Sequence, residues 1–186
     1  SDIVLRGGTY QQVLVVLDGL RLNDPNTGHF SSYIPIAPSE IDRIEVLKGA
    51  SSAIYGSEAV GGVIHVISKA FAAKLTSSNE EGTIKKSSAN ASVTGGEYGL
   101  FNINAGGFIQ RDKLALSAGV LSNNANGVQQ RGTKGYFHNN TASVSAQYAL
   151  SPQWHVGLRS SFDHRDFAAQ NFYTTFASDT ANEQVK

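Results

Sequence analysis

The sequence predicts an α+β domain followed by antiparallel strands of a transmembrane β-barrel, and within these 186 residues the barrel is incomplete. Three observations lead to this fold class. Residues 1–69 contain short aliphatic runs that stop at glycine, whereas the chain from residue 89 onward alternates apolar and polar side chains with a period of two. The mean hydropathy of −0.20 is the third, because alternating strands average to such a value and membrane helices do not.

Composition excludes several classes of protein. The 15 Lys and Arg residues balance the 15 Asp and Glu residues, which removes the simplest electrostatic case for binding nucleic acid or an anionic membrane. The absence of Cys excludes a disulfide scaffold, Cys-ligated zinc and thiol catalysis. The chain also has no Met, although a complete reading frame normally begins with one, so we expect a mature product or a piece of a longer chain.

The first part of the chain is predicted to hold four short strands. They are rich in β-branched residues and lie at residues 3–5, 13–17, 44–47 and 63–67. Each reads as a buried strand because it is wholly apolar or nearly so. Between the second and third strands, residues 23–28 are turn formers and predict an exposed loop. Pro38 predicts the start of a helical turn, with Glu40 near the positive end of the helix dipole.

Residues 70–88 lose all periodicity and are predicted to be a linker. Five alternating runs follow, at residues 89–94, 101–105, 114–120, 141–150 and 154–165. In the fourth run, Ala142 and Val144 alternate with Ser143 and Ser145, so one face of the strand is apolar and the other is polar. The longest purely aliphatic run is Val13–Leu17, far short of the ~20 residues that a membrane helix requires.

The connections between these runs alternate in length. Residues 110–113 and 151–153 are short turns, whereas residues 122–136 form a long polar loop, as in outer-membrane barrels. Tyr148 and Trp154 flank a short turn, where an interfacial aromatic girdle would place them. Soluble half-buried strands alternate too, so a soluble sheet stays open as an alternative at this point. Strands of about 10 residues favour the barrel, although five strands cannot close one.

Residues 1–69 resemble the plug domain of TonB-dependent outer-membrane receptors. The motifs that carry the resemblance are VLRG at 4–7, VLVVLDGLRLND at 13–24, IDRIEVLKG at 41–49 and SAIYGSEAVGGVIHVISK at 52–69. Residues 89–166 resemble the opening barrel strands, most like those of the cobalamin-transporter branch. The sequence DPNTGH at 24–29 resembles a plug loop of Bacteroidetes-type receptors.

The resemblance implies a barrel of about 22 strands in the outer membrane of a Gram-negative bacterium, closed by the plug. It implies import of a scarce nutrient, of the cobalamin or metal-siderophore class, with energy from the inner-membrane TonB complex. The implied partners are that complex, the small-molecule ligand, outer-membrane lipid and, for the Bacteroidetes type, a surface lipoprotein. Relative to the family, the chain lacks the N-terminal box, the first part of the plug and most of the barrel, so we expect a fragment that does not transport by itself.

The resemblance also assigns site residues. The apex loop of the plug is the predicted ligand contact, and its candidate residues are Asn23, Asp24, Asn26, Thr27, His29, Phe30 and Tyr33. A solvated turn is the alternative reading of this loop. Arg6 and Lys48 lie where the family has basic plug residues that pair with wall carboxylates on later strands, and such a buried pair can act as a latch between plug and barrel. The alternative for both is an ordinary solvated ion pair.

No catalytic, cofactor or metal site is predicted. The five histidines, which are His29, His65, His138, His155 and His164, lack the His-Glu-x-x-His spacing of zinc sites. The acids near residue 24 do not match the twelve-residue calcium loop, and whether calcium aids ligand binding stays open. The charged residues of the fifth run, His155, Arg159, Asp163 and Arg165, are expected to be solvated wall charges. An adhesin or passive-pore barrel, and a secreted β-rich enzyme, are the alternative functions; the enzyme is disfavoured because no nucleophile and base come together.

Overall fold

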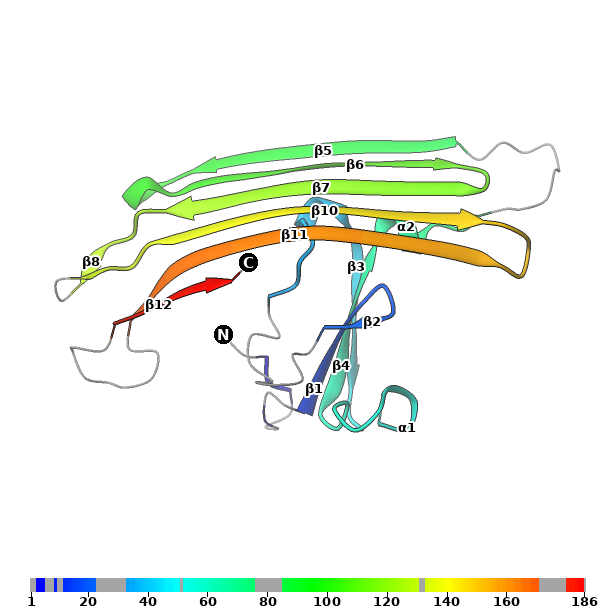
Figure 1. Ribbon diagram of the computed structural model, residues 1–186, viewed down its shortest axis with the longest axis horizontal. Helices are drawn as coiled ribbons and strands as arrows, with labels where there is room; N and C mark the ends of the chain where they lie inside the picture. The colour runs from blue at the N-terminus through cyan, green and yellow to red at the C-terminus, as the bar shows by residue number, and fades with distance from the viewer. Residues whose placement is uncertain are drawn as a thin grey trace. The chain divides into compact units, whose positions relative to one another are not determined.

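The computed structural model describes residues 3–5, 9, 12–22, 33–50, 52–75, 85–130, 133–170 and 180–185. These residues fall into two compact units (Figure 1). The first unit comprises residues 1–34 and 41–74, and the second comprises residues 35–40 and 75–186. The second unit therefore takes a short segment out of the first half of the chain. In the described residues, no helix has the length and apolar character needed to cross a membrane.

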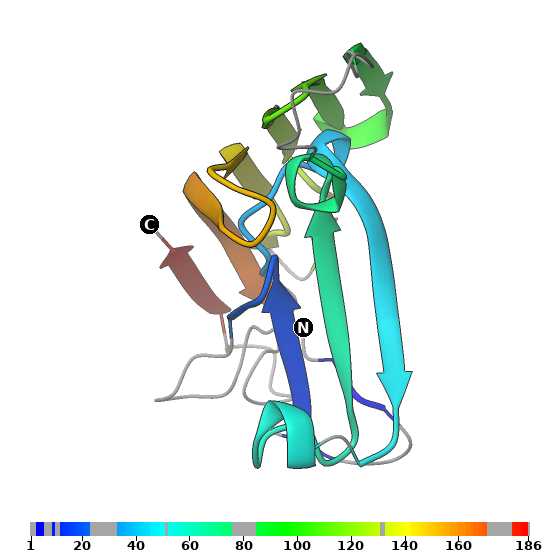
Figure 2. The ribbon, with the colours of Figure 1, turned by 90° about the vertical axis from the view of Figure 1, so that its right-hand side faces the viewer.

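The first unit is built on a four-stranded sheet in the order β2-β1-β4-β3, three strands of which are seen side by side in Figure 2. Its strands are β1 (Val13–Leu17), β2 (Leu20–Arg21), β3 (Ile41–Lys48) and β4 (Gly62–Ser68). β1 and β4 are parallel, and the other pairs are antiparallel. Asp18 and Gly19 both have positive φ, at 50° and 89°, which gives the tight two-residue turn that joins β1 to β2.

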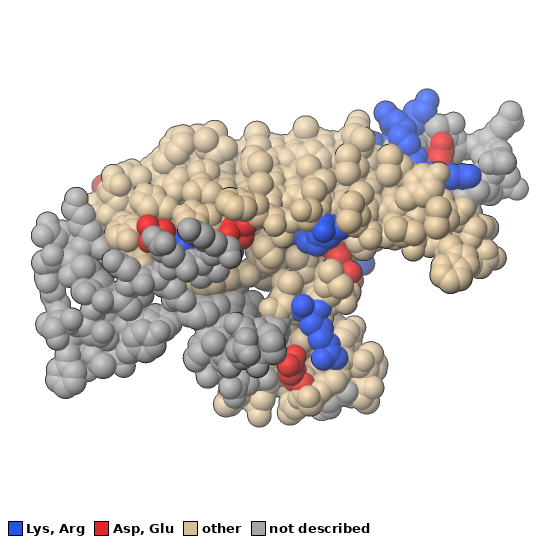
Figure 3. Space-filling view, viewed as in Figure 1, with Lys and Arg blue, Asp and Glu red and all other residues tan. Residues whose placement is uncertain are grey.

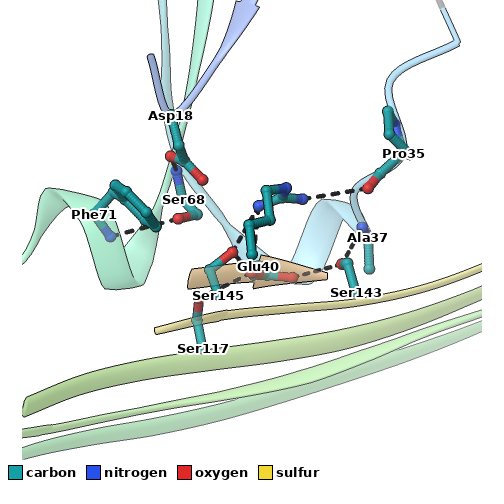
Figure 4. Close-up of polar contacts among 10 residues, drawn as sticks. Asp18, Pro35, Ala37, Glu40, Ser68, Phe71, Ser117, Ser143 and Ser145 are labelled. Carbon is teal, nitrogen blue, oxygen red and sulfur yellow. Dashed lines mark hydrogen bonds and ion pairs between the residues drawn. The ribbon is translucent and has the colours of Figure 1, made fainter. Parts of the chain in front are cut away.

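The core of the first unit lies between β1 and β4. All five residues of β1 are buried, and Leu14, Val16, Ala59 and Val63 form one cluster with Leu47 and Tyr55 at its edge. Two short helices, α1 (Ser52–Tyr55) and α2 (Lys69–Ala72), flank β4 in the sequence. The hydroxyl of Ser68 caps α2 by accepting from Phe71 N at 3.4 Å, and Ser68 N donates to Asp18 Oδ1 at 2.7 Å (Figure 4).

Three of the four strands predicted in this unit are confirmed, and the first is wrong. Residues 3–5 are not in a strand, because the four-stranded sheet pairs none of its members with them. A Cβ on Gly62 would lie 2.9 Å from Leu5 Cδ1, so residue 5 packs beside β4 without joining it. β3 is a strand as predicted but is not buried in this chain: it is an edge strand, and Ile44 is 55% exposed.

The second unit is a six-stranded antiparallel sheet in the order β12-β11-β10-β7-β6-β5. Its strands are β5 (Lys85–Gly95), β6 (Phe101–Arg111), β7 (Leu114–Ala125), β10 (Phe137–Ala149), β11 (His155–Gln170) and β12 (Thr180–Val185). Figure 1 shows β5, β6, β7, β10 and β11 as long strands running side by side. A 3₁₀ turn, η3 (Glu97–Gly99), joins β5 to β6, and a two-residue turn at Asp112 joins β6 to β7.

The five alternating runs are confirmed as strands, and the alternation of short and long connections is confirmed with one correction. Residues 122–136 are not wholly a loop, because β7 continues to Ala125, where it still pairs with Phe137 of β10. The rest of that stretch contains a small two-stranded sheet of β8 (Gln129–Gln130) and β9 (Thr133–Lys134). Both ends of the expected linker 70–88 are also structured, since α2 extends to Ala72 and β5 begins at Lys85.

The six-stranded sheet has a polar and an apolar face, and the apolar face is the exposed one. We call the face that bears Ser117, Ser143 and Ser145 the inner face, and all three of these serines are buried. The opposite, outer face carries Leu158 at 71% exposure and exposed Val144, Val156 and Phe162. Charged atoms are sparse on the side of the sheet visible in Figure 3. This distribution is the reverse of that in a soluble half-buried sheet.

Candidate functional site

Most of the residues predicted to bind the ligand lie outside the described part of the chain. These are Asn23, Asp24, Asn26, Thr27, His29 and Phe30, and the latch residue Arg6 lies outside it as well. Tyr33 is described and is half-buried, two residues before Pro35. Lys48 is the last residue of β3 and is exposed. The ligand loop and the latch therefore stay predictions.

The segment of residues 35–40 provides a site that the sequence did not predict. It ends in a 3₁₀ turn, η2 (Pro38–Glu40), which Glu40 N closes by donating to Ala37 O at 2.9 Å. Proline suits the first position of this turn because its φ is already fixed near the helical value. The predicted helical turn is thus confirmed, and it packs on the inner face of β6 and β7 within the second unit.

Strand pairing brings the residues under this segment into two rows across the inner face. Ser145 of β10 lies opposite Ser117 of β7 on one side and opposite Arg159 of β11 on the other. In the next inner-face row, Ser143 lies opposite Gly119 of β7, which in turn lies opposite Gly106 of β6. Directly opposed side chains in such ladders have their Cβ atoms about 4.5–5.5 Å apart, close enough to share one partner.

Two glycines allow the segment to approach the sheet. A Cβ on Gly106 would lie 2.5 Å from Ser39 Oγ and 2.8 Å from the carbonyl oxygen of Ala118. A Cβ on Gly119 would lie 2.7 Å from both Ala37 Cβ and Ser39 Oγ. Any larger residue at either position would collide with the segment, so these glycines serve close backbone approach.

Main-chain and side-chain hydrogen bonds hold the segment along its length. Ala37 N donates to Ser143 Oγ at 3.0 Å, and Ser39 N donates to Asn104 Oδ1 at 3.2 Å. The Ser39 hydroxyl donates to the carbonyl oxygen of Ala105 at 2.8 Å. Backbone groups that carry no helix or sheet partner are thereby satisfied by the wall of strands.

The carboxylate of Glu40 lies at the centre of these contacts and is 0% exposed. Its Oε1 accepts from Ser117 Oγ at 3.0 Å and from Ser145 Oγ at 2.5 Å, and its Oε2 accepts from Ser143 Oγ at 2.5 Å (Figure 4). Arg159 Nη1 lies 3.7 Å from Oε1. We refer to Glu40, Ser117, Ser143, Ser145 and Arg159 as the Glu40 cluster. A buried carboxylate is tolerated when donors and a cation surround it in this way.

Arg159 joins the two ends of the segment. Its Nη1 donates to Ser145 Oγ at 2.6 Å, and its Nη2 donates to the carbonyl oxygen of Pro35 at 3.2 Å. The Arg159 side chain is only 8% exposed. One guanidinium therefore contacts the first residue of the segment directly and reaches the last residue, Glu40, through a serine.

The structure corrects two expectations about these residues. Glu40 does not merely face a helix dipole, because its carboxylate is enclosed by hydroxyls from β7 and β10. Arg159 is not a solvated wall charge, because residues 35–40 cover it. Asp163 and Arg165 are shielded as well: they form a 2.6 Å ion pair in which the side chains are 14% and 11% exposed. His155 is exposed, as expected.

The signal that could have indicated the cluster is the row of hydroxyls on β10. Thr141, Ser143 and Ser145 occupy one face of a strand and are all uncharged hydrogen-bond donors. Nothing in the local sequence says which acid they serve, because Glu40 and Ser145 are 105 residues apart. Only the folded sheet brings them together.

Two pKa shifts outside this cluster have plain causes. Hydrogen bonds from Arg43 to Glu45 and then to Asp42, at 2.7 and 3.1 Å, raise the pKa of the Arg43 guanidinium above its ordinary value. Burial, followed by a hydrogen bond to Asp166, raises the pKa of the Tyr136 phenol. Both shifts favour the form that each side chain already has at neutral pH, so neither group is prepared for proton transfer.

The Glu40 cluster can hold a segment but is not arranged for catalysis or for metal binding. Its serines donate to a carboxylate, and no histidine stands between the two as a base. Among the described residues, no three or more His, Cys, Asp or Glu side chains are placed to hold a metal ion.

The first part of the chain matches known proteins in sequence. A family model described as the TonB-dependent Receptor Plug Domain matches residues 1–63. The vitamin B12 transporter BtuB of Vibrio vulnificus (strain CMCP6) is 37% identical over 84 residues, which are 45% of this chain and 12% of that protein. BtuB of Vibrio cholerae serotype O1 (strain M66-2) is 42% identical over 71 residues, which are 38% of this chain and 11% of that protein.

Solved structures share the fold of both units. The copper transporter OprC matches 86% of this chain with a TM-score of 0.64 at 15% identity, and the match covers 24% of OprC. The siderophore receptor PirA of Acinetobacter baumannii matches 87% of this chain with a TM-score of 0.58 at 22% identity, and the match covers 25% of PirA. The chain thus spans about a quarter of these structures, and at such identities the likeness concerns the fold alone. Residues 1–63 thus match the plug-domain model of TonB-dependent receptors, and antiparallel strands follow them as in the structures that the chain matches.

Proposed function

We propose that the chain is part of a TonB-dependent transporter in the outer membrane of a Gram-negative bacterium. The whole protein binds a scarce nutrient at its external face and imports it into the periplasm with energy from the inner-membrane TonB complex. The observation that carries this proposal is the plug-domain match over residues 1–63, since this domain defines the receptor family. We further propose domain bounds of 1–69 for the plug, 70–88 for the linker and 89–186 for the opening strands of the barrel.

The exposed apolar face of the six-stranded sheet supports a membrane location. Leu158 and Trp154 are 71% and 72% exposed, and Val156 and Phe162 are also largely exposed on the same face. In water, such a contiguous apolar surface would promote association with other proteins. Against lipid it is the expected surface of a barrel strand, whose lumen-facing residues are polar.

The apolar face also ends where a membrane boundary would require. Ser122, Asn140 and His164 lie opposite one another on β7, β10 and β11, and each is two residues away from an apolar residue of the outer face: Val120, Ala142 and Phe162. Ser122 Oγ donates to Asn140 Oδ1 at 2.8 Å within this polar row. From Ala142 to Leu150 the apolar positions span roughly 26 Å along the chain, or about 20 Å along the membrane normal at the usual strand tilt of about 35–45°, which fits within the about 25 Å band of outer-membrane barrels.

The nutrient belongs, in our proposal, to the cobalamin or metal-siderophore class. Support comes from the names of the relatives, which are vitamin B12 transporters in sequence and a siderophore receptor in fold. We assign its contacts to the predicted apex loop at residues 23–33. The Bacteroidetes-type assignment, and with it a surface lipoprotein partner, stays a prediction, and the curated relatives named above come from Vibrio.

Uptake by the full-length gene product tests the proposed function. The gene is expressed in a strain that lacks its own receptors, and growth is measured on single sources of cobalamin, ferric siderophore or haem, with and without functional TonB. We expect growth on one source that disappears without TonB. Growth that is independent of TonB would instead support a passive pore, and no growth on any source would overturn the transport proposal.

The assignment of the loop needs its own test. In the full-length protein, a Gly/Ser linker replaces residues 23–33, and a matched linker replaces the turn at residues 151–153 as the control. We expect the first variant to bind the identified nutrient more weakly and the second to bind it normally, with both assembling in the outer membrane. Unchanged affinity in the first variant would refute the loop as a ligand contact.

A further inference from the structure

We propose that Glu40 is a positioning residue that fixes residues 35–40 on the inner face of the barrel wall and thereby fixes the end of the predicted ligand loop. Its charges are reversed relative to the latch expected from Arg6 and Lys48: here the acid is in residues 35–40 and the cation is Arg159 of β11. The role in ligand positioning rests on the proposed function, whereas the anchoring itself does not.

The first argument is the identity of the buried residue. Glu40 is the only charged residue in the segment, and it is nonetheless completely buried. Burying a carboxylate is so costly that an apolar side chain of similar volume would usually give equal or greater stability. The best-attested benefit of a buried charge is that it specifies one register, because only one placement satisfies it.

The second argument is the geometry of the donors. Ser143 and Ser145 are two residues apart on β10, so both face the segment, and each binds a different oxygen of Glu40. Ser117 of β7 adds a third donor from the neighbouring strand. A shift of the segment along the strands by one residue would withdraw Glu40 from these hydroxyls. It would also move Ala37 and Ser39 away from Gly106 and Gly119, the two positions that leave space for them.

The third argument concerns the beginning of the segment. Arg159 holds the carbonyl oxygen of Pro35 through Nη2 and reaches Glu40 through Ser145. Tyr33, the last residue of the predicted ligand loop, is two residues before Pro35 in the chain. Holding Pro35 therefore limits where the C-terminal end of that loop can lie.

Hydrogen exchange in the full-length protein tests the anchor without any ligand. Glu40→Gln keeps the shape of the side chain and removes its charge, and Glu40→Ala removes the carboxyl group altogether. The matched control is Glu45→Gln, since Glu45 is 44% exposed and pairs only with Arg43 among the ion pairs of the described residues. Exchange is measured by mass spectrometry on peptides that cover residues 35–40, with peptides from β1 and β4 as internal references.

We expect both Glu40 variants to exchange the amides of Ala37 and Ser39 at least about tenfold faster, because these amides are protected by the wall only while the segment is seated. Glu45→Gln should leave the rate unchanged. If the Glu40 variants do not assemble, the double variant Ser117→Ala, Ser145→Ala removes both donors to Glu40 Oε1 instead and should give the same increase. It leaves in place the Ser143 hydroxyl that accepts from Ala37 N. Rates within twofold of the wild type in the assembled variants would overturn the anchor.

The outcome is separable from that of the transport proposal. If no nutrient supports growth but the Glu40 variants still release the segment, the anchor stands and transport falls. If transport is established and exchange is unchanged, the anchor falls and transport stands. Where both hold, the Glu40→Gln receptor should bind the nutrient identified by growth more weakly than the Glu45→Gln receptor, and equal affinities would remove the ligand-positioning role.

Discussion

Ser145 lies between Arg159 and Glu40, and it hydrogen-bonds to both. Its hydroxyl oxygen accepts from Arg159 Nη1 at 2.6 Å and donates its proton to Glu40 Oε1 at 2.5 Å. The two charged groups themselves are 3.7 Å apart at their nearest atoms. The serine hydroxyl thus bridges the two charged groups with two hydrogen bonds, and it is polarised from both sides.

Replacing Ser145 should therefore have a larger effect than a serine substitution usually has. Ser145→Ala removes a donor from Glu40 and an acceptor from Arg159, leaving two buried charged groups less satisfied, at a cost of about 1–3 kcal/mol. The measurement is the free energy of opening of residues 35–40 by hydrogen exchange. Ser161→Ala is the control, because Ser161 lies on the same inner face opposite Ser143 but is exposed. Equal effects of the two substitutions would contradict the role given to Ser145.

Arg159 should not be replaceable by lysine. Its two terminal nitrogens serve Ser145 and Pro35 at once, and a single ammonium group cannot reproduce that planar fork. We expect Arg159→Lys to lose about as much protection of residues 35–40 as Arg159→Met does. A double-mutant cycle with Glu40→Gln should give a coupling free energy of about 1–3 kcal/mol.

The control for this cycle is Arg43→Lys, since the Arg43 side chain is 50% exposed and surface ion pairs contribute about 0–1 kcal/mol. Full protection in Arg159→Lys, or additive effects in the cycle, would show that the guanidinium and the carboxylate act independently.

Periodicity predicted the strands well and the contacts of the inner face poorly. The runs that form β7 and β10 are identifiable because the two faces of a sheet impose opposite demands on alternate residues, and these demands are local. Val13–Leu17 is equally clear, since a strand buried on both faces is apolar throughout. Residues 3–5 look similar but have no strand to pair with, which the local sequence cannot indicate.

The site required knowledge that no local pattern contains. Glu40 looked like an acid at a helix start, and Arg159 looked like a solvated charge on a strand. The first holds for the 3₁₀ turn but gives no hint of the hydroxyls around the carboxylate, and the second is wrong because residues 35–40 cover Arg159. The apex loop and the latch were assigned from the family resemblance, and Tyr33 and Lys48 are their only described members.

Alanine at Gly119 of β7 should release residues 35–40 from the sheet, whereas alanine at Gly107 of β6 should not. Gly119→Ala places a methyl group 2.7 Å from Ala37 Cβ, so the segment has to move away and lose its bonds to Ser143 and Asn104. Gly107→Ala is the matched control, because a Cβ there would have only Ser88 O nearby, at the ordinary contact distance of 3.7 Å. Faster exchange of residues 35–40 is expected in Gly119→Ala alone. Normal exchange in Gly119→Ala would mean that the segment is not held close to the sheet.

The predicted latch calls for a separate measurement. If Arg6 and Lys48 pair with carboxylates on later strands of the whole barrel, neutralising both to Gln leaves those carboxylates buried and unpaired, and the plug should loosen. Entry of a large glycopeptide antibiotic through the outer membrane should then increase. Lys113→Gln is the control, since Lys113 lies in the short turn between β6 and β7. Unchanged entry in the double variant would leave Arg6 and Lys48 as ordinary surface charges.

The membrane boundary can be located with two arginine substitutions on β11. Leu158 lies within the apolar band of the outer face, and His164 lies in the polar row with Ser122 and Asn140, on the same face of the same strand. Leu158→Arg should lower the free energy of unfolding of the full-length barrel in lipid vesicles by about 2–4 kcal/mol, because it places a charge in hydrocarbon.

His164→Arg should lower that free energy by no more than about 1 kcal/mol, since near the interface the arginine side chain reaches water. Both are measured by equilibrium unfolding in guanidinium with tryptophan fluorescence, for which Trp154 is the one tryptophan of this chain. If the sheet were part of a soluble protein, Leu158→Arg would instead raise the solubility of the protein in detergent-free aqueous solution. A small effect of Leu158→Arg in vesicles would therefore exclude lipid as the partner of this face and return the sheet to the soluble alternative.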